Sequence, residues 1–252
     1  MLRVLNCNND IEIAYHQIPG ELPGVIYLSG YMSDMSGTKA LYLENLCKQL
    51  GHAFLRFDYQ GHGASSGHFE AGTIGLWKND VLAVLDELTE GPQILVGSSM
   101  GGWLMLLAAL QRPDRVAGLL GIASAPDFTE DLVEKLEPAQ QKALENDGIC
   151  YVPSTYGDKP YPFTKQLVSD GKQHHILGNS IPLHCPIRLI HGSNDTHVLW
   201  RQSLRLMEGV ESPDTLLTLI KNGDHRLSSE SDLHILGTTL KELLHDSTHL
   251  AV

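Results

Sequence analysis

Ser99 lies in a segment whose residue types suit a nucleophile. The pentapeptide Gly97-Ser98-Ser99-Met100-Gly101 has the form G-x-S-x-G and follows the apolar run at residues 94–96. A second apolar stretch, residues 102–110, comes directly after it. A buried strand, a sharp turn centred on serine and an apolar helix make a nucleophile elbow, which presents the serine hydroxyl at the end of a sheet. Serine is a poor nucleophile until a base activates it, so a histidine and a carboxylate must lie elsewhere in the chain.

A second match, Gly63-Ala64-Ser65-Ser66-Gly67, shows that the motif by itself is weak. Loop-like residues precede it and no apolar helix follows it, so we expect a polar turn there. Within the first match, Ser98 is excluded as the nucleophile. Its neighbours two residues away are Val96 and Met100, where the turn needs glycine for close backbone approach.

The candidate acid and base are Asp195 and His225. Asp195 follows the apolar run at residues 187–190, and His225 follows the run at residues 216–220. Because parallel strands end at one edge of a sheet, both loops leave the sheet on the side of Ser99. We expect His225 to take the Ser99 proton, and Asp195 to accept a hydrogen bond from the other ring nitrogen.

The oxyanion of the reaction needs two backbone donors. One expected donor is the N–H of Met100, directly after the nucleophile, and the other is the N–H of Tyr31 in the segment Ser29-Gly30-Tyr31. Losing one such donor costs about 3 kcal/mol of transition-state stabilisation.

Other roles are open for the serine and the carboxylates. Ser99 could cap a helix or bind phosphate, although no lysine follows the turn as a phosphate-binding loop requires. Asp195 could be a turn former only. Asp224 is an alternative acid, but it adjoins His225 and would orient that ring poorly.

The base also has alternatives. His191 and His197 lie near Asp195, but their positions favour the end of a strand and the start of a helix. Trp103 is expected to pack in the core, with a contact to the acyl group as the alternative.

Composition excludes several classes of function. The chain of 252 residues carries a net charge of −12 and no basic cluster, which disfavours nucleic acid as a partner. The four cysteines are far apart in sequence, which favours reduced thiols. The histidines lack metal-ligand spacing, and we expect neither a metal nor a cofactor. No apolar run reaches about 18 residues, so we expect no membrane span.

Apolar strand patterns and amphipathic helix patterns alternate along the chain, which predicts one α/β domain with a mostly parallel sheet covered on both faces. Strands are expected at residues 25–28, 53–57, 94–96, 116–122, 187–190 and 216–220, after an antiparallel pair at 2–5 and 11–18. Helices are expected at residues 40–50, 77–88, 101–110, 198–207 and 233–244.

The alternation breaks between residues 126 and 182. This stretch holds a helix pattern at 128–146 and then several prolines and aromatic residues, namely Tyr151, Pro153, Tyr156, Pro160, Tyr161, Pro162 and Phe163. It is too long for an ordinary loop. We expect a core formed by residues 1–125 and 183–252, with residues 126–182 inserted as a small lid over the carboxyl ends of the strands.

At these residues the chain resembles the α/β-hydrolase fold superfamily. It resembles in particular the mitochondrial palmitoyl-protein thioesterases of animals, abhydrolases that also hydrolyse the acyl glucuronide of mycophenolic acid. The segments that carry the resemblance are Gly30–Ala40, Arg56–Tyr59, Gly91–Ser99 and Cys185–Leu189.

The resemblance implies the α/β-hydrolase fold, with a mostly parallel eight-stranded sheet, helices on both faces and a small lid. By position, the nucleophile of the family falls on Ser99, its acid on Asp195 and its base on His225. The animal enzymes carry a mitochondrial leader, whereas this chain begins almost at its first strand, so we expect a cytoplasmic location.

The function expected from the residues is that of a serine hydrolase, which cleaves carboxylic esters or acyl thioesters through an acyl-enzyme at Ser99. The resemblance implies S-depalmitoylation or acyl-glucuronide cleavage. The substrate is then a small-molecule or lipid acyl ester or thioester, or an acylated protein. Two alternatives remain open: carbon–carbon bond hydrolysis or perhydrolysis by the same residues, and a non-catalytic ligand-binding protein on the same fold.

Overall fold

A mostly parallel sheet forms the centre of the molecule. The computed structural model describes residues 2–7, 10–154 and 159–249. Within these residues, eight strands lie in the order β1-β2-β4-β3-β5-β6-β9-β10. Their bounds are β1 Arg3–Asn6, β2 Glu12–Ile18, β3 Glu21–Leu28, β4 His52–Phe57, β5 Gln93–Ser98, β6 Val116–Ile122, β9 Ile187–Gly192 and β10 Thr215–Ile220. Strand β2 pairs antiparallel with β1 and β4, and the other neighbours are parallel. The predicted sheet, with its antiparallel start, is confirmed.

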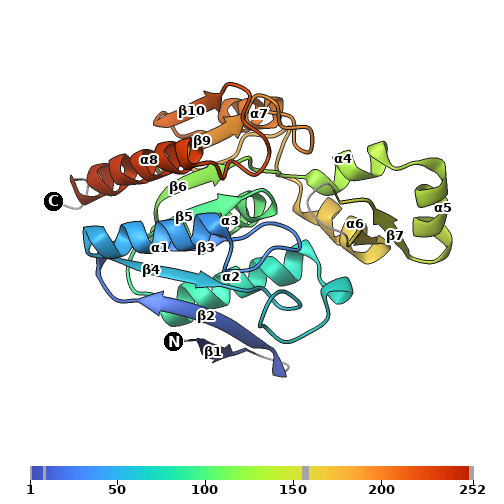
Figure 1. Ribbon diagram of the computed structural model, residues 1–252, viewed down its shortest axis with the longest axis horizontal. Coiled ribbons are helices and arrows are strands. Elements are labelled where there is room, and N and C mark those ends of the chain that lie inside the picture. The colour runs from blue at the N-terminus through green and yellow to red at the C-terminus, as the bar shows by residue number, and fades with distance from the viewer. Residues whose placement is uncertain (1, 8–9, 155–158, 250–252) are drawn as a thin grey trace.

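Helices cover both faces of this sheet (Figure 1). Helices α1 (Thr38–Leu50) and α8 (Glu230–His249) pack on one face, and α2 (Ile74–Leu88), α3 (Met100–Gln111) and α7 (Arg201–Gly209) pack on the other. Each face has its own hydrophobic cluster. The molecule therefore has the α/β architecture that the alternating patterns predict.

Strand β5 carries the elbow and is buried along its whole length. Side chains of a strand alternate between the two faces of its sheet. Ile94 and Val96 accordingly join the cluster under α1 and α8, while Leu95 joins the cluster under α2 and α3. Burial on both sides fixes the register of β5, and with it the position at which the chain turns into α3.

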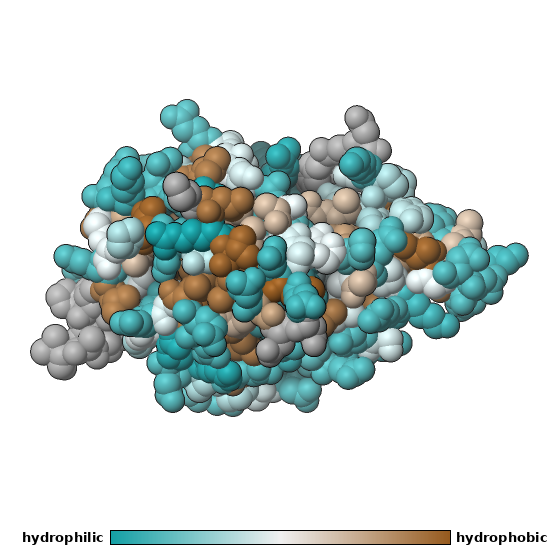
Figure 2. Space-filling view, turned by 90° about the horizontal axis from the view of Figure 1, so that it is seen from below, coloured by the Kyte–Doolittle hydropathy of each residue, from teal (hydrophilic) through white to brown (hydrophobic). Residues whose placement is uncertain are grey.

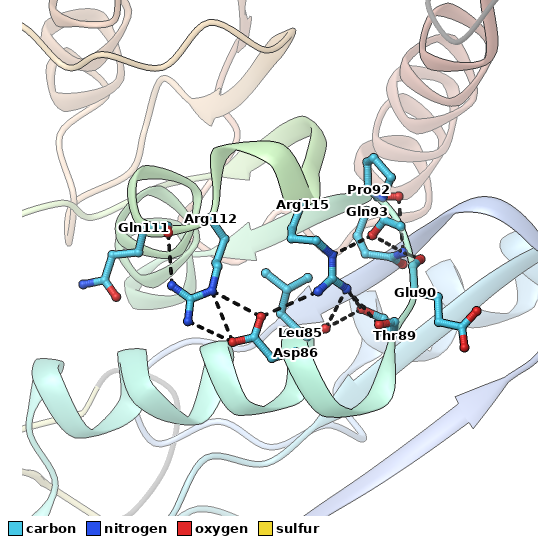
Figure 3. Close-up of polar contacts among 10 residues, drawn as sticks. Leu85, Asp86, Thr89, Glu90, Pro92, Gln93, Gln111, Arg112 and Arg115 are labelled. Carbon is cyan, nitrogen blue, oxygen red and sulfur yellow. Dashed lines mark hydrogen bonds and ion pairs between the residues drawn. The ribbon is translucent and has the colours of Figure 1, made fainter.

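Two arginines bind the carboxyl-terminal end of α2, at the side of the sheet opposite the elbow (Figure 3). The Nη2 group of Arg112 donates to the Asp86 carboxylate at 3.0 Å. The Nη2 group of Arg115 donates to the carbonyl oxygens of Leu85 and Thr89, at 2.9 and 2.8 Å. The last carbonyls of a helix lack intrahelical donors, so these contacts satisfy the end of α2 and join it to the turn before β6.

Residues 126–182, here called the cap segment, interrupt the alternation and lie at one end of the molecule (Figure 1). They contain α4 (Phe128–Lys135), α5 (Pro138–Asn146), α6 (Lys165–Gly171), and the antiparallel pair β7 (Ile149–Val152) and β8 (Tyr161–Thr164). Tyr156 of the expected lid lies outside the described residues.

Two helix predictions need correction. The single helix predicted at residues 128–146 is wrong, because Leu136 and Glu137 have extended backbones and separate α4 from α5. Proline disfavours the helical conformation in the residue before it, and Pro138 fits at the first position of α5. Helix α7 begins at Arg201 rather than at residue 198, because the preceding residues form the turn around Asp195.

The surface mixes apolar and hydrophilic side chains. Figure 2 looks toward the β1 edge of the sheet, where apolar side chains lie between hydrophilic ones. Leu2 and Val4 are among the exposed apolar residues of the molecule. Among the helices of the described residues, none has the length and apolar character needed to cross a bilayer.

Asp80 is a buried carboxylate in α2, with only 4% of its surface exposed. It accepts hydrogen bonds from the backbone N–H and the side-chain amide of Gln60, at 2.9 and 3.0 Å. Burial raises the pKa of Asp80 to about 7, because the two Gln60 hydrogen bonds offset the desolvation only in part. In the unfolded chain an aspartate pKa is about 3.9.

We predict that Asp80 makes the protein less stable as the pH rises from about 4 to about 7. In this range the folded state holds a proton that the unfolded state has lost, so the free energy of unfolding falls with increasing pH. The Asp80→Asn variant lacks this titration. Urea unfolding at pH 4.5 and pH 8 should show the wild type losing roughly 3 kcal/mol relative to the variant. Parallel pH profiles for the two proteins would contradict the prediction.

Candidate active site

Ser99 occupies a strained turn between β5 and α3. Its backbone has φ 54° and ψ −119°, a combination that residues with a side chain rarely adopt. Two hydrogen bonds to the end of β6 and to the loop after it hold Ser99 there: Ser99 N–H donates to Ile122 O at 2.9 Å, and Ala125 N–H donates to Ser99 O at 3.0 Å. Strain of this kind persists only where the surrounding structure enforces it, and it concentrates at functional sites.

The glycines of the motif are required by close backbone contacts. A Cβ atom on Gly97 would lie 2.4 Å from the Gly101 carbonyl oxygen. A Cβ atom on Gly101 would lie 2.2 Å from the carbonyl oxygen of Leu28, at the end of β3. Neither position has space for a side chain, which is the physical basis of the predicted elbow.

The three residues predicted to act together do meet. Ser99 Oγ lies 3.1 Å from His225 Nε2, and His225 Nδ1 lies 2.7 Å from Asp195 Oδ2. The carboxylate oxygen is an acceptor, so Nδ1 carries the proton and Nε2 is the acceptor for the serine hydroxyl. His225 follows β10 and Asp195 follows β9, so the sheet edge brings together side chains 126 and 30 residues apart.

The carboxylate of Asp195 is buried and fully hydrogen-bonded. Its Oδ1 accepts from the backbone N–H groups of His197 and Val198, both at 2.9 Å. Its Oδ2 lies near His225 and also 3.1 Å from Nε2 of His191. Burial alone would raise the pKa of Asp195, but the hydrogen bonds from His191 and His225 outweigh it, so the net pKa lies well below the ordinary value. Asp195 therefore stays ionised.

His191 contacts the acid directly, which the sequence reasoning missed. Strand β9 continues to Gly192, so His191 lies one residue before its end rather than at the end as expected, and its ring is completely buried against Asp195. Its Nε2 is also 2.9 Å from Val198 O, and its Nδ1 is 2.7 Å from Ser203 Oγ. Both partners of Nε2 are acceptors, so Nε2 carries the proton and Nδ1 accepts from the serine hydroxyl. The sequence feature that could have indicated this contact is the position of His191, four residues before Asp195 and near the end of a predicted strand.

The alternative residues have other contacts. Asp224 Oδ1 accepts from Leu227 N–H at 3.0 Å within a turn. The ring of His197 stacks on that of His225, with the centroids 5.3 Å apart. His197 lies before α7 rather than at its start, so the expectation that it begins the helix is wrong.

The second G-x-S-x-G segment and Trp103 have the structures that the sequence predicts. The second motif forms the predicted turn, where Ser65 Oγ donates to Asp58 O at 2.6 Å and accepts from Ala14 N–H at 2.8 Å. Trp103 is fully buried and donates to His174 O at 3.1 Å, so it packs in the core as expected.

A pocket of about 720 Å³ opens above Ser99 and His225. The cap segment contributes one wall, which is mostly apolar: Phe128, Leu132, Leu136, Val152, Pro153, Tyr161 and Phe163. Charged residues from the cap segment and from the rest of the chain also line the pocket: the basic residues Lys39, Lys135, Lys159 and Arg226 and the acidic residues Asp34 and Asp131. The pocket is therefore amphipathic.

The two expected oxyanion donors lie beside the elbow. Met100 and Tyr31 line the same pocket as Ser99. Met100 is the first residue of α3, and the first N–H groups of a helix have no intrahelical acceptor. A Cβ atom on Gly30 would lie 3.4 Å from both Ser98 O and Ser99 Cβ, so the Tyr31 loop runs against the elbow.

Other reactive groups are separate from this site. All four cysteines are free thiols, and Cys47 and Cys150 are buried. In the described residues, no group of three or more His, Cys, Asp and Glu side chains is arranged to hold a metal ion.

Known proteins are similar to this chain in sequence and in fold. A model of the serine aminopeptidase S33 family matches residues 24–146. The chain is 44% identical to the mouse protein "Palmitoyl-protein thioesterase ABHD10, mitochondrial", over 96% of this chain and 82% of the mouse chain. The structure of mouse alpha/beta hydrolase domain-containing protein 10 superposes with a TM-score of 0.91 at 42% identity, covering 98% of this chain and 99% of that chain. A putative hydrolase from Agrobacterium vitis S4 also gives a TM-score of 0.91, at 38% identity, covering 97% and 98% of the two chains.

These comparisons correct one expectation and confirm another. The expected cytoplasmic location is wrong, because relatives from mouse, rat and human are named as mitochondrial proteins. The resemblance to the α/β-hydrolase fold is confirmed by the sheet, the helices and the superposition. The chain belongs to the ABHD10 family of α/β-hydrolase enzymes.

Proposed function

We propose that this enzyme cleaves carboxylic esters or acyl thioesters, with Ser99 as nucleophile, His225 as general base and Asp195 as the acid that orients it. The observation that carries the proposal is the continuous chain of hydrogen bonds from Ser99 Oγ through His225 to Asp195, at 3.1 and 2.7 Å. This chain lies at a pocket large enough for an acyl group. The names of the relatives, palmitoyl-protein thioesterases, support an acyl thioester as substrate.

The reaction follows from the proton positions. His225 Nε2 takes the proton of the Ser99 hydroxyl while Oγ bonds to the acyl carbon. The bond from this carbon to the leaving oxygen or sulfur then breaks, and His225 returns the proton to the leaving group. Water releases the acyl group by the same route, and Ser99 regains its proton. The ionised Asp195 stabilises the imidazolium that forms in each half of the reaction.

The negative oxygen of each tetrahedral intermediate needs donors that are already in place. The backbone N–H groups of Met100 and Tyr31 are the proposed pair. Supporting this assignment, both residues line the pocket, and the Tyr31 loop contacts the elbow without an intervening side chain at Gly30.

His191 is the proposed positioning residue for Asp195. Its Nε2–H is shared between the carboxylate and Val198 O, which fixes the tautomer, and the Ser203 hydroxyl donates to Nδ1 on the other side of the ring. A carboxylate held on both oxygens keeps one orientation toward His225, and this reduces the reorganisation needed when the imidazolium forms.

The cap segment is the proposed lid, inserted into a core of residues 1–125 and 183–252. Its aromatic and aliphatic side chains suit an apolar acyl chain, while the charged residues of the pocket suit a polar leaving group. The proposed substrate therefore has an apolar acyl chain joined by an ester or thioester to a polar carrier, and a lipid or an acylated protein meets this description.

Replacing Ser99 tests the nucleophile. The Ser99→Ala variant should lose roughly 10⁴-fold or more of kcat on an activated acyl ester, because no attacking oxygen remains beside His225. A fluorophosphonate probe should label the wild type and leave this variant unlabelled. The Ser65→Ala variant is the matched control, because it removes the serine of the second motif and should keep both activity and labelling. Retained turnover in folded Ser99→Ala protein would overturn the proposed function.

Replacing His191 tests the positioning role. In His191→Asn the amide oxygen remains available to Ser203, but no donor reaches Asp195. Losing a hydrogen bond to a charged group should lower kcat roughly tenfold, and KM should stay nearly constant because His191 does not line the pocket. His184→Asn changes a solvent-exposed histidine and should keep the wild-type kcat. A folded His191→Asn enzyme with the wild-type kcat would exclude the role.

The acyl-chain preference tests the pocket assignment. Across N-acetylcysteamine thioesters with straight chains of four to ten carbons, kcat/KM should rise by up to about fourfold per added methylene, because each buried CH₂ contributes about 0.8 kcal/mol. A chain that ends in a hydroxyl group should gain less. The same kcat/KM for all chain lengths would mean that the acyl chain does not enter the apolar part of the pocket.

A further inference from the structure

The side chain of Tyr31 connects the loop after β3 to the cap segment. Its hydroxyl donates a hydrogen bond to the carbonyl oxygen of Pro162 in β8, a residue 131 positions later in the chain. Its ring stacks on Phe163 with the centroids 5.0 Å apart and the planes 7° from parallel. One side chain thus makes both a polar and a stacking contact with β8.

The rest of the Tyr31 ring is enclosed by aromatic side chains. Edge contacts reach Phe69 at 4.8 Å, Trp77 at 5.8 Å and Phe128 at 5.9 Å. Such pairs contribute beyond the area they bury, so the ring has one strongly preferred position. Burial, and then the nearby Cys150 and Glu70, raises the pKa of Tyr31 far above its ordinary value, so the hydroxyl keeps its proton and remains a donor.

The backbone of the same residue lies at the elbow. Gly30 separates Tyr31 from Ser29, and a Cβ atom on Gly30 would be 3.4 Å from Ser98 O and Ser99 Cβ. On the other side of the elbow, Gly101 is packed directly against the Leu28 and Ser29 carbonyls. The loop and the elbow are therefore in backbone contact, and residue 31 carries both the ring that contacts β8 and the N–H group beside the elbow. A misplacement of about 1 Å at a reacting centre costs on the order of 10²-fold in rate.

We propose that Tyr31 is a positioning residue that couples the seating of the β7–β8 pair to the oxyanion hole. This inference rests on the proposed function, since it assigns the Tyr31 N–H to the oxyanion. When β8 is seated on the Tyr31 ring, the N–H is held beside Ser99; when β8 moves away, the donor loses its support. An acyl chain that packs against Phe163 would stabilise the seated state, so its binding energy would raise kcat as well as lower KM.

Tyr151 provides a matched control on the same pair of strands. Its hydroxyl donates to Glu70 Oε1 at 3.2 Å and so joins β7 to the body of the molecule. This contact is exposed, and Tyr151 is not part of the pocket lining. Removing the Tyr151 hydroxyl weakens a link between the β7–β8 pair and the core, but leaves the Tyr31 loop untouched.

The test compares Tyr31→Phe, Tyr151→Phe and the wild-type chain. For each protein, kcat and KM are measured on p-nitrophenyl octanoate. Inhibition is then measured with an octyl trifluoromethyl ketone, which forms an oxyanion adduct on serine, and with the matching secondary alcohol, which cannot.

Tyr31→Phe keeps the ring and loses only the hydrogen bond to Pro162. The variant should lower kcat and the affinity for the ketone by roughly tenfold, which is less than the loss in kcat when an oxyanion donor is removed completely. The KM and the affinity for the alcohol should stay within about twofold of the wild type. Tyr151→Phe should match the wild type in all four quantities.

A second variant approaches the coupling from the cap segment. Phe163→Leu removes the stacked ring and also alters the pocket wall, so ketone and alcohol both bind differently. Because both inhibitors make the same contact with the pocket wall, the loss of that contact does not change the ratio of ketone affinity to alcohol affinity. This ratio should still fall about as much as in Tyr31→Phe. This ratio tests the proposal even if one variant is poorly folded.

Several results would overturn the coupling. If the ratio of ketone affinity to alcohol affinity is unchanged in both Tyr31→Phe and Phe163→Leu, Tyr31 has only a packing role. An equal fall of kcat in Tyr151→Phe would assign the effect to general loosening of the strand pair. Failure of the proposed function is distinguishable, because Ser99→Ala would then stay active or the wild type would take no fluorophosphonate label, whereas Tyr31→Phe should still be labelled at Ser99.

Discussion

The strained backbone at Ser99 is the constraint on which the site depends. The residue keeps a positive φ because β5 is buried on both faces, α3 starts at once, and the turn is bound by Ile122 of β6 and by Ala125 in the loop after it. Gly97 and Gly101 permit the close contacts that this turn needs. A hydroxyl presented in this way is directed at the sheet edge, where the loops after β9 and β10 supply the imidazole and the carboxylate.

A buried charge is the second constraint on this site. Asp195 is expensive to bury unless each of its oxygens is satisfied, and four donors meet that need: two backbone N–H groups and two imidazole rings. His191 thereby belongs to the same network as His225, and Ser203 extends it into α7. The contacts that hold Asp195 thus come from residues outside the cap segment, while the cap segment forms an apolar wall of the pocket and contacts Tyr31.

Much of this arrangement follows from the sequence for physical reasons. The strands of the sheet are continuous apolar runs and the helices have apolar faces, so their order predicts the fold, and the fold brings Ser99, Asp195 and His225 to one edge. The cap segment was harder to predict, because Pro138 splits a pattern that reads as one helix and because β7 and β8 have only four residues each. The contacts of His191 and Tyr31 depend on tertiary packing, and neither leaves a periodic signal in the chain.

The most direct test of the central claim is to locate the acyl group during turnover. The enzyme is mixed with an octanoyl thioester, quenched in acid within milliseconds, digested and analysed by tandem mass spectrometry. The account predicts an octanoyl ester on Ser99 and a lower yield of this adduct in a His225→Gln variant, in which acylation is slow. Turnover with the acyl group on Ser65 or on a cysteine, or with no covalent adduct at any quench time, would contradict it.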